Sequence, residues 1–121
     1  MLALVIASGA ALSAAAVIWH VGSSRDQVRA ATVYAAYLAR VHLARERGDE
    51  ETARHWAERA GALKRAFNRA FWLPDRGYFA LGLDGDKRPI DALGSNMGHC
   101  LWTGIVDKDK AVSVAVSMRA R

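Results

Sequence analysis

The residues of this chain best suited to chemistry gather between Asp91 and Trp102, where an amide, an imidazole and an indole stand among small residues. An indole can stack on the apolar face of a pyranose ring, and asparagine and histidine can hydrogen-bond its hydroxyl groups. The mixture therefore suits a sugar pocket. A purely structural interpretation stands beside it, in which Ser95 caps a helix while Asn96 and His99 satisfy buried backbone groups.

Other chemistries are poorly supported by the spacing of the residues. His99 and Cys100 are adjacent, so a helix points them about 100° apart, and neither a metal site nor a Cys–His nucleophile follows. The run from Asp84 to Asp86 resembles the start of a calcium loop, but the twelfth position holds Ser95 instead of a bidentate glutamate. A polar turn is the better interpretation, and we expect no metal and no cofactor.

Four aspartates in the same part of the chain are the candidates for the paired carboxylates of glycoside chemistry. The turns that hold them look exposed, which predicts ordinary acidity, so none is nominated as catalytic. They are Asp75, Asp84, Asp86 and Asp91.

Length and composition limit the class of protein. The chain has 121 residues, a formal net charge of +5 and no Asp, Glu, Lys or Arg before Arg25. One domain is expected at most, and four Trp, three Tyr and three Phe argue against a disordered chain. The lone Cys100 excludes a disulfide scaffold.

The excess of basic over acidic residues does not by itself indicate a nucleic-acid partner. Between residues 50 and 69 the arginines and lysines alternate with glutamates on a predicted helix, and no recognised nucleic-acid-binding motif is present. This pattern is typical of a solvated helix face.

The apolar leader, residues 1–24, has a composition of its own. As a helix, residues 1–21 would span roughly the ~30 Å of a bilayer core, which makes a membrane anchor one interpretation. A secretory signal is a second, although no basic residue precedes the apolar run, and an alanine-rich segment with neither role is a third. If the leader spans a membrane, Arg25 and Arg29 keep the rest of the chain cytoplasmic.

Two amphipathic helices are predicted next, over residues 32–47 and 50–72. Apolar residues recur in both at steps of three and four. Gly48 can end the first helix, and Asp49 can cap the second, whose first turn is acidic. Because the turn is so short, we expect an antiparallel αα-hairpin. The stripes are Tyr34, Tyr37, Leu38, Val41 and Ala44, then Ala53, Trp56, Ala57, Ala60, Leu63, Phe67 and Phe71.

The remaining elements are shorter. Residues 77–83 and 87–90 predict a small β-hairpin around the Asp84-Gly85 turn. Ser95 is expected to cap a helix through about Val106, and residues 107–118 predict a last helix.

Three stretches carry a resemblance to a known family. FNRAFWLPDRGYFAL (67–81), LDGDKRPIDAL (83–93) and above all SNMGHCLWTGIV (95–106) resemble bacterial glycogen-debranching enzymes of the amylo-alpha-1,6-glucosidase type. The resemblance runs from about Val33 to Ala115. It implies a six-hairpin glycosidase with an (α/α)6 toroid, so the chain would be mainly α: an apolar helix, then a partial toroid of one αα-hairpin, a short β-hairpin and two further helices.

The resemblance also implies a site. Ser95, Asn96, His99 and Trp102 match the motif near the family's sugar pocket, so they are expected to bind an alpha-glucan or oligosaccharide in a cytoplasmic enzyme. The family's two catalytic carboxylate segments are absent from this chain, and inverting glycosidases need both groups. Residues 25–121 are therefore expected to be an inactive fragment, with a second chain that supplies the missing toroid as a candidate partner.

Two other classes compete with the glycosidase fragment. Residues 43–53 also resemble the helix-turn-helix of a tetratricopeptide unit, which would make the chain a protein-binding module. A small membrane-anchored protein, with the leader as its functional element, is the other. For the glycosidase fragment, a four-helix piece of a twelve-helix toroid has too small a core to hide Trp56, Phe67, Phe71 and Trp102 together, which predicts association or marginal folding.

Overall fold

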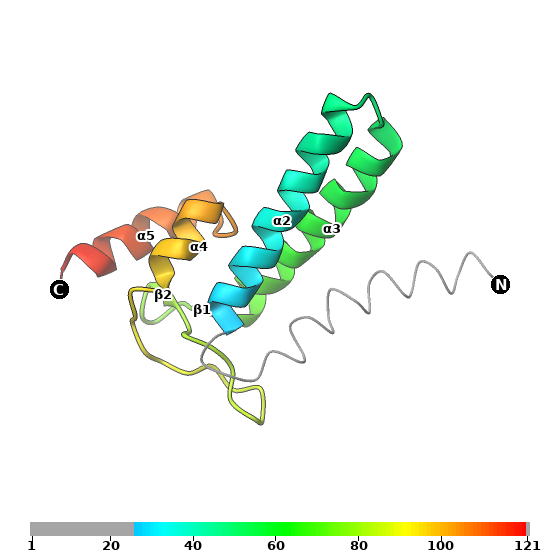
Figure 1. Cartoon of the computed structure of the whole chain (residues 1–121). Coiled ribbons are helices and arrows are strands. Elements are labelled where there is room, and N and C mark those ends of the chain that lie inside the picture. Colours follow the sequence, from blue (N-terminus) through cyan, green and yellow to red (C-terminus); the bar gives the residue numbers. More distant parts are fainter. Residues whose placement is uncertain (1–25, 121) are drawn as a thin grey trace.

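The computed structural model describes residues 26–120 and is mainly helical (Figure 1). Two long helices form one arm, and a two-stranded hairpin with two short helices packs at its base. No helix within residues 26–120 is long and apolar enough to cross a membrane. The predictions for the leader, residues 1–24, lie outside the described residues.

The predicted αα-hairpin is confirmed. Helix α2 (Asp26–Glu46) and helix α3 (Glu50–Ala70) pack along their length (Figure 1). Gly48 takes a left-handed conformation with φ +73°, which a glycine adopts without steric cost. The Asp49 carboxylate accepts a hydrogen bond from the Thr52 amide at 3.0 Å. The turn is therefore set by the local signals that the sequence carries.

The interface between the two helices largely follows the predicted stripes. Tyr34, Val41 and Ala44 are buried on α2, whereas Leu38 is 40% exposed and does not belong to the packed face. Helix α2 also begins six residues before the predicted start at Thr32, and Ala30 and Ala31 are buried in this added part. They are buried because α2 also packs against helix α4 (Met97–Thr103), a contact that periodicity could not reveal.

An aromatic stack forms the centre of the core at the base of the arm. Phe67 lies 4.8 Å from Phe71 and 5.0 Å from Phe79, measured between ring centroids, and all three are fully buried. Burial of these three rings removes a large apolar area from water, and because Phe79 lies on β2 the stack joins α3 to the following hairpin.

The regular two-stranded pairing lies before the predicted β-hairpin and overlaps only its first segment. Strand β1 (Trp72–Leu73) pairs antiparallel with strand β2 (Tyr78–Phe79), and the chain turns through Gly77 at φ +73°. A Cβ at Gly77 would lie 2.6 Å from the Ser113 hydroxyl, so a larger residue there would also force the Ser113 side chain to move.

The hairpin predicted around Asp84-Gly85 forms irregularly, with one antiparallel bridge between Leu83 and Pro89. Backbone hydrogen bonds also join the two segments: the Leu81 amide donates to the Ile90 carbonyl at 3.0 Å, and the Ile90 amide donates to the Gly82 carbonyl at 2.9 Å. The Asp84 carboxylate accepts hydrogen bonds from the Asp86 and Arg88 amides at 2.9 Å, which curls the chain into a polar turn.

The two C-terminal helices meet the core at different places. Helix α4 is shorter than predicted because Gly104 ends it in a left-handed conformation, while helix α5 (Lys108–Arg119) matches its prediction within one residue. Asn68 ties their loop to α3: its amide nitrogen donates to the Lys64 and Ile105 carbonyls at 2.7 Å, and its oxygen accepts from the Asp107 amide at 3.0 Å.

Candidate functional site

Three of the four predicted sugar-binding residues meet at one open hollow, which we call the α4 hollow. Ser95, Gly98, His99 and Trp102 line this cavity of about 460 Å³. Gly98 and Trp102 lie four residues apart on α4 and therefore share a helix face. Met97 and Cys100 point into the core instead and are fully buried. The short helix is thus anchored on one side and presents the candidate site on the other.

Trp102 is the most prominent residue of the α4 hollow. Its side chain is 82% exposed, more than that of any other large apolar residue among the described ones. His99 is also exposed. The hollow therefore offers a flat apolar ring beside an imidazole and a hydroxyl, with no carboxylate in its lining.

Asn96 lies apart from this group. It lines a separate hollow of about 430 Å³ together with Val28, Arg29, Thr32 and Val33 of α2. The structure therefore brings Ser95, His99 and Trp102 together and does not place Asn96 with them.

The start of α4 corrects the predicted cap. The helix begins at Met97, its N-cap residue is Asn96, and no side chain caps it. The Ser95 and Asn96 carbonyls accept the first amides, from Gly98 at 3.1 Å and His99 at 3.0 Å. These tight i to i+3 bonds satisfy the helix end through the backbone, so the Ser95 hydroxyl is not needed as a cap.

Two of the aspartates near the hairpin, Asp84 and Asp91, have a lowered pKa, contrary to the prediction of ordinary acidity. The Tyr78 hydroxyl donates to Asp91 at 2.5 Å, Arg76 lies 2.7 Å away, and together they lower the pKa of Asp91. Hydrogen bonds from the Arg88 and Asp86 amides likewise lower the pKa of Asp84. A general acid needs the opposite shift, so neither aspartate is suited to protonate a glycosidic oxygen at neutral pH.

Cys100 cannot act as a nucleophile in this environment. Its sulfur is buried 3.8 Å from the Gln27 carbonyl oxygen, and desolvation raises the pKa of the thiol to about 12. Within residues 26–120 no three His, Cys, Asp or Glu side chains come together in a way that could hold a metal ion.

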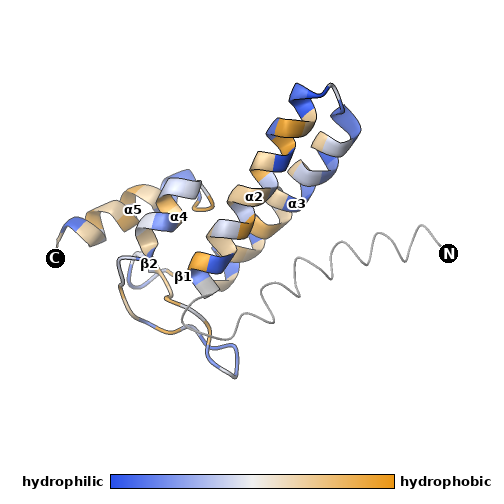
Figure 2. Cartoon of the chain, viewed as in Figure 1, coloured by the Kyte–Doolittle hydropathy of each residue, from blue (hydrophilic) through white to orange (hydrophobic). Residues whose placement is uncertain are grey.

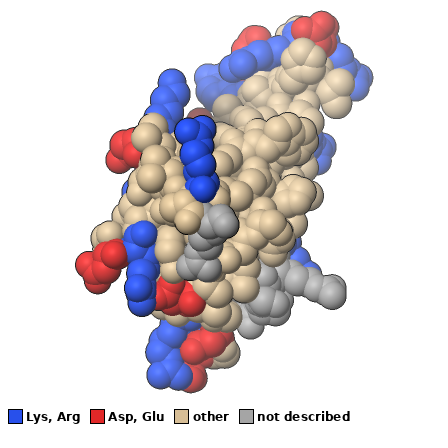
Figure 3. All heavy atoms as spheres, turned by 90° about the vertical axis from the view of Figure 1, so that its left-hand side faces the viewer, with Lys and Arg blue, Asp and Glu red and all other residues tan. Residues whose placement is uncertain are grey.

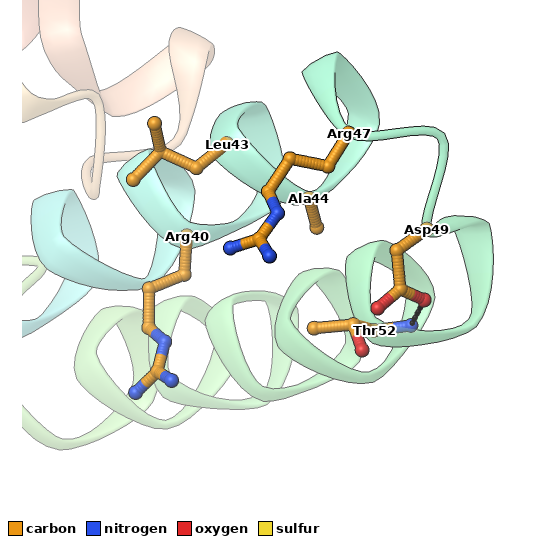
Figure 4. Close-up of a pocket in the computed structure, with 6 residues that line it drawn as sticks. All are labelled: Arg40, Leu43, Ala44, Arg47, Asp49 and Thr52. Atoms are coloured by element: carbon orange, nitrogen blue, oxygen red, sulfur yellow. Dashed lines mark hydrogen bonds between the residues drawn. The ribbon is translucent and has the colours of Figure 1, made fainter.

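A second hollow, which was not predicted from the sequence, lies at the tip of the αα-hairpin. Figure 4 shows Arg40 and Arg47 pointing into this cavity of about 490 Å³, beside Asp49 and Thr52. The two arginines lie seven residues apart, two helical turns, which is the signal that could have found them. The Arg40 guanidinium stacks on Trp56 at 4.1 Å, and the Asp49 carboxylate is held by Thr52, so the hollow carries both signs of charge.

Charged residues elsewhere are also mixed in sign. Figure 3 looks onto the side of the molecule that carries the C-terminal end of α5, where blue and red atoms are interspersed among uncharged areas. A basic stripe of the kind that follows a nucleic-acid backbone is not seen on this face.

The chain matches no protein-family model, no curated protein and no solved structure. The chemistry of the α4 hollow and the resemblance of its residues are therefore the observations on which a function can be argued.

Proposed function

We propose that this chain is a fragment of a glycoside hydrolase of the glycogen-debranching, amylo-alpha-1,6-glucosidase type, and that its α4 hollow binds an alpha-glucan or oligosaccharide. The observation that carries the proposal is the grouping of Ser95, His99 and Trp102 around one open cavity. These residues belong to the stretch with the strongest family resemblance, SNMGHCLWTGIV.

The exposure of Trp102 supports a ligand on this face. An indole left in water forfeits the stabilisation that its burial would bring, and a large exposed apolar side chain is a common mark of a binding surface. The ring of a sugar covers such a surface while its hydroxyl groups reach the neighbouring polar side chains. The mainly helical fold, with its αα-hairpin, is compatible with a portion of a toroid.

Under this proposal the chain binds sugar without hydrolysing it. Glycoside hydrolysis needs two carboxyl groups flanking the scissile bond. The α4 hollow has none in its lining, and Asp84 and Asp91 are held ionised in their own turns.

The test is titration of the full chain with maltooligosaccharides, followed by tryptophan fluorescence, together with an assay for glucose release from a branched alpha-glucan. We expect saturable binding that Trp102→Ala abolishes. Leu43→Ala is the matched control, because Leu43 is also exposed (60%) but lies on the arm. Since Trp102 is exposed, its variant should keep the far-UV circular dichroism of the parent.

Absence of binding, or binding that survives in Trp102→Ala, would show that the proposal is wrong. Glucose release by the full chain would overturn the prediction that it lacks catalysis.

The tetratricopeptide alternative is weakened by the length of the helices. Helices α2 and α3 have 21 residues each, whereas a tetratricopeptide unit fits both helices and its turns into about 34 residues. No described contact favours it over the glycosidase fragment.

A further inference from the structure

The outer face of α5 is a second exposed apolar surface, distinct from the α4 hollow. Val112 is 68% exposed and Val116 is 63% exposed, whereas Val114, on the opposite side of the helix, is fully buried. Figure 2 shows α5 as largely apolar along most of its length. Asp109 and Arg119 are also exposed. We call the face formed by Asp109, Val112, Val116 and Arg119 the α5 face.

The spacing of the α5 face is that of a helix-pairing seam. Its four residues follow one another at steps of three, four and three, the a and d positions of a heptad. On a helix these positions form one stripe, here centred opposite buried Val114. The seam has an apolar centre and one charge of each sign at its two ends.

This arrangement is self-complementary. In an antiparallel pair of α5 helices related by a two-fold axis, Val112 lies opposite the partner's Val116, and Asp109 lies opposite the partner's Arg119. The valine contact and the ion pair are then each formed twice. In a parallel pair, each charge would face its own copy and repel it. The charge order therefore selects a second copy of this chain in the antiparallel orientation.

We propose that the α5 face is the interface of an antiparallel homodimer. The proposal does not rest on the sugar-binding function, since the α5 face and the α4 hollow share no residue. Helix α5 has 12 residues and is about 18 Å long, so the pair buries a small area and the dimer is in concentration-dependent equilibrium with the monomer.

Sedimentation equilibrium of the full chain over a concentration series tests this dimer. We expect Val112→Lys with Val116→Lys to weaken dimerisation by about a hundredfold, because each dimer loses four apolar side chains and gains four cations. Both positions are exposed, so the substitutions should not disturb the fold, which far-UV circular dichroism checks. Leu43→Lys, at an exposed apolar position on the arm, is the matched control and should leave the dimer unchanged.

The ion pairs permit a sharper test. Asp109→Arg and Arg119→Asp should each weaken their own homodimer by about tenfold, since like charges then meet across the interface. When the two variants are mixed, both pairs of opposite charges are restored in the heterodimer, which should form about as strongly as the wild-type dimer.

A monomer at all concentrations would overturn the proposal. So would self-association that the lysine substitutions leave unchanged, or a mixture of charge variants that associates no better than its components, because association would then be driven by another part of the chain.

Discussion

The tip and the base of the αα-hairpin are built from different kinds of contact. At the tip, a small cluster of Val41, Ala44 and Ala53 packs beside a turn whose glycine and capping aspartate are neighbours in sequence. At the base, Phe67 and Asn68 contact residues of the β-hairpin and of the loop before α5. Local contacts thus shape the tip, and contacts between distant parts of the chain stabilise the base.

The largest effect is expected at the aromatic stack. Phe67→Ala should lower the free energy of unfolding by about 3–5 kcal/mol, because it leaves a cavity between Phe71 and Phe79. Chemical denaturation measures the change. Leu43→Ala, exposed near the tip, is the control and should change stability by about 0.5 kcal/mol or less. Equal losses of unfolding free energy in the two variants would contradict this difference between the base and the tip.

The buried amide of Asn68 should come next. Asn68→Leu removes the partners of two carbonyl oxygens and one amide, so we expect a loss of about 3 kcal/mol. Hydrogen exchange of the Asp107 amide should also accelerate, which separates loss of the network from a general loss of stability. A variant as stable as the parent would show that this network does not hold the base together.

Replacing Gln27 by leucine should have the opposite effect on stability to replacing Asn68. It is fully buried like an interior residue, yet neither polar atom of its side chain has a hydrogen-bond partner among the described residues. Gln27→Leu should therefore raise the free energy of unfolding by about 1 kcal/mol. Denaturation of both leucine variants under the same conditions makes the comparison. Destabilisation by Gln27→Leu would mean that its amide has a partner.

The smallest effect is expected at the tip. The hydrogen bonds from Thr52 lower the pKa of Asp49, so its stabilising contribution is present above the ordinary aspartate pKa of 3.8 and is lost as the pH falls through its lowered value. Asp49→Ala should be less stable than the parent at pH 7, and the difference should fade in strong acid. A difference that stays constant with pH would show that the carboxylate charge plays no part in the cap.

Sequence patterns predicted well where signals are local. The αα-hairpin, its glycine turn and the bounds of α5 follow from periodicity, capping and helix-breaking residues within a few positions. The turn at Asp84-Gly85 was predicted, and the structure has an antiparallel bridge and backbone hydrogen bonds around it, but the strand pair that turns through Gly77 was missed. Phe79, on that strand pair, packs in the aromatic stack with α3, a contact between distant residues that no local pattern shows.

The geometry of the candidate site also could not be predicted from local sequence patterns. The residue types between Ser95 and Trp102 suggested a sugar pocket, but whether they share one surface depends on how α4 is seated. Met97 and Cys100 are drawn into the core, and this rotation exposes His99 and Trp102 while turning Asn96 toward α2.

The sequence by itself determined the helical class, the antiparallel arm and the chemical character of the α4 stretch, because helix periodicity and capping act between residues close in the chain. Only the tertiary structure decided where the regular strand pair forms, which face of α4 lines a hollow, and that Val112 and Val116 stay exposed. Burial depends on contacts between distant segments, and a pattern along one helix shows an apolar stripe without showing whether anything covers it.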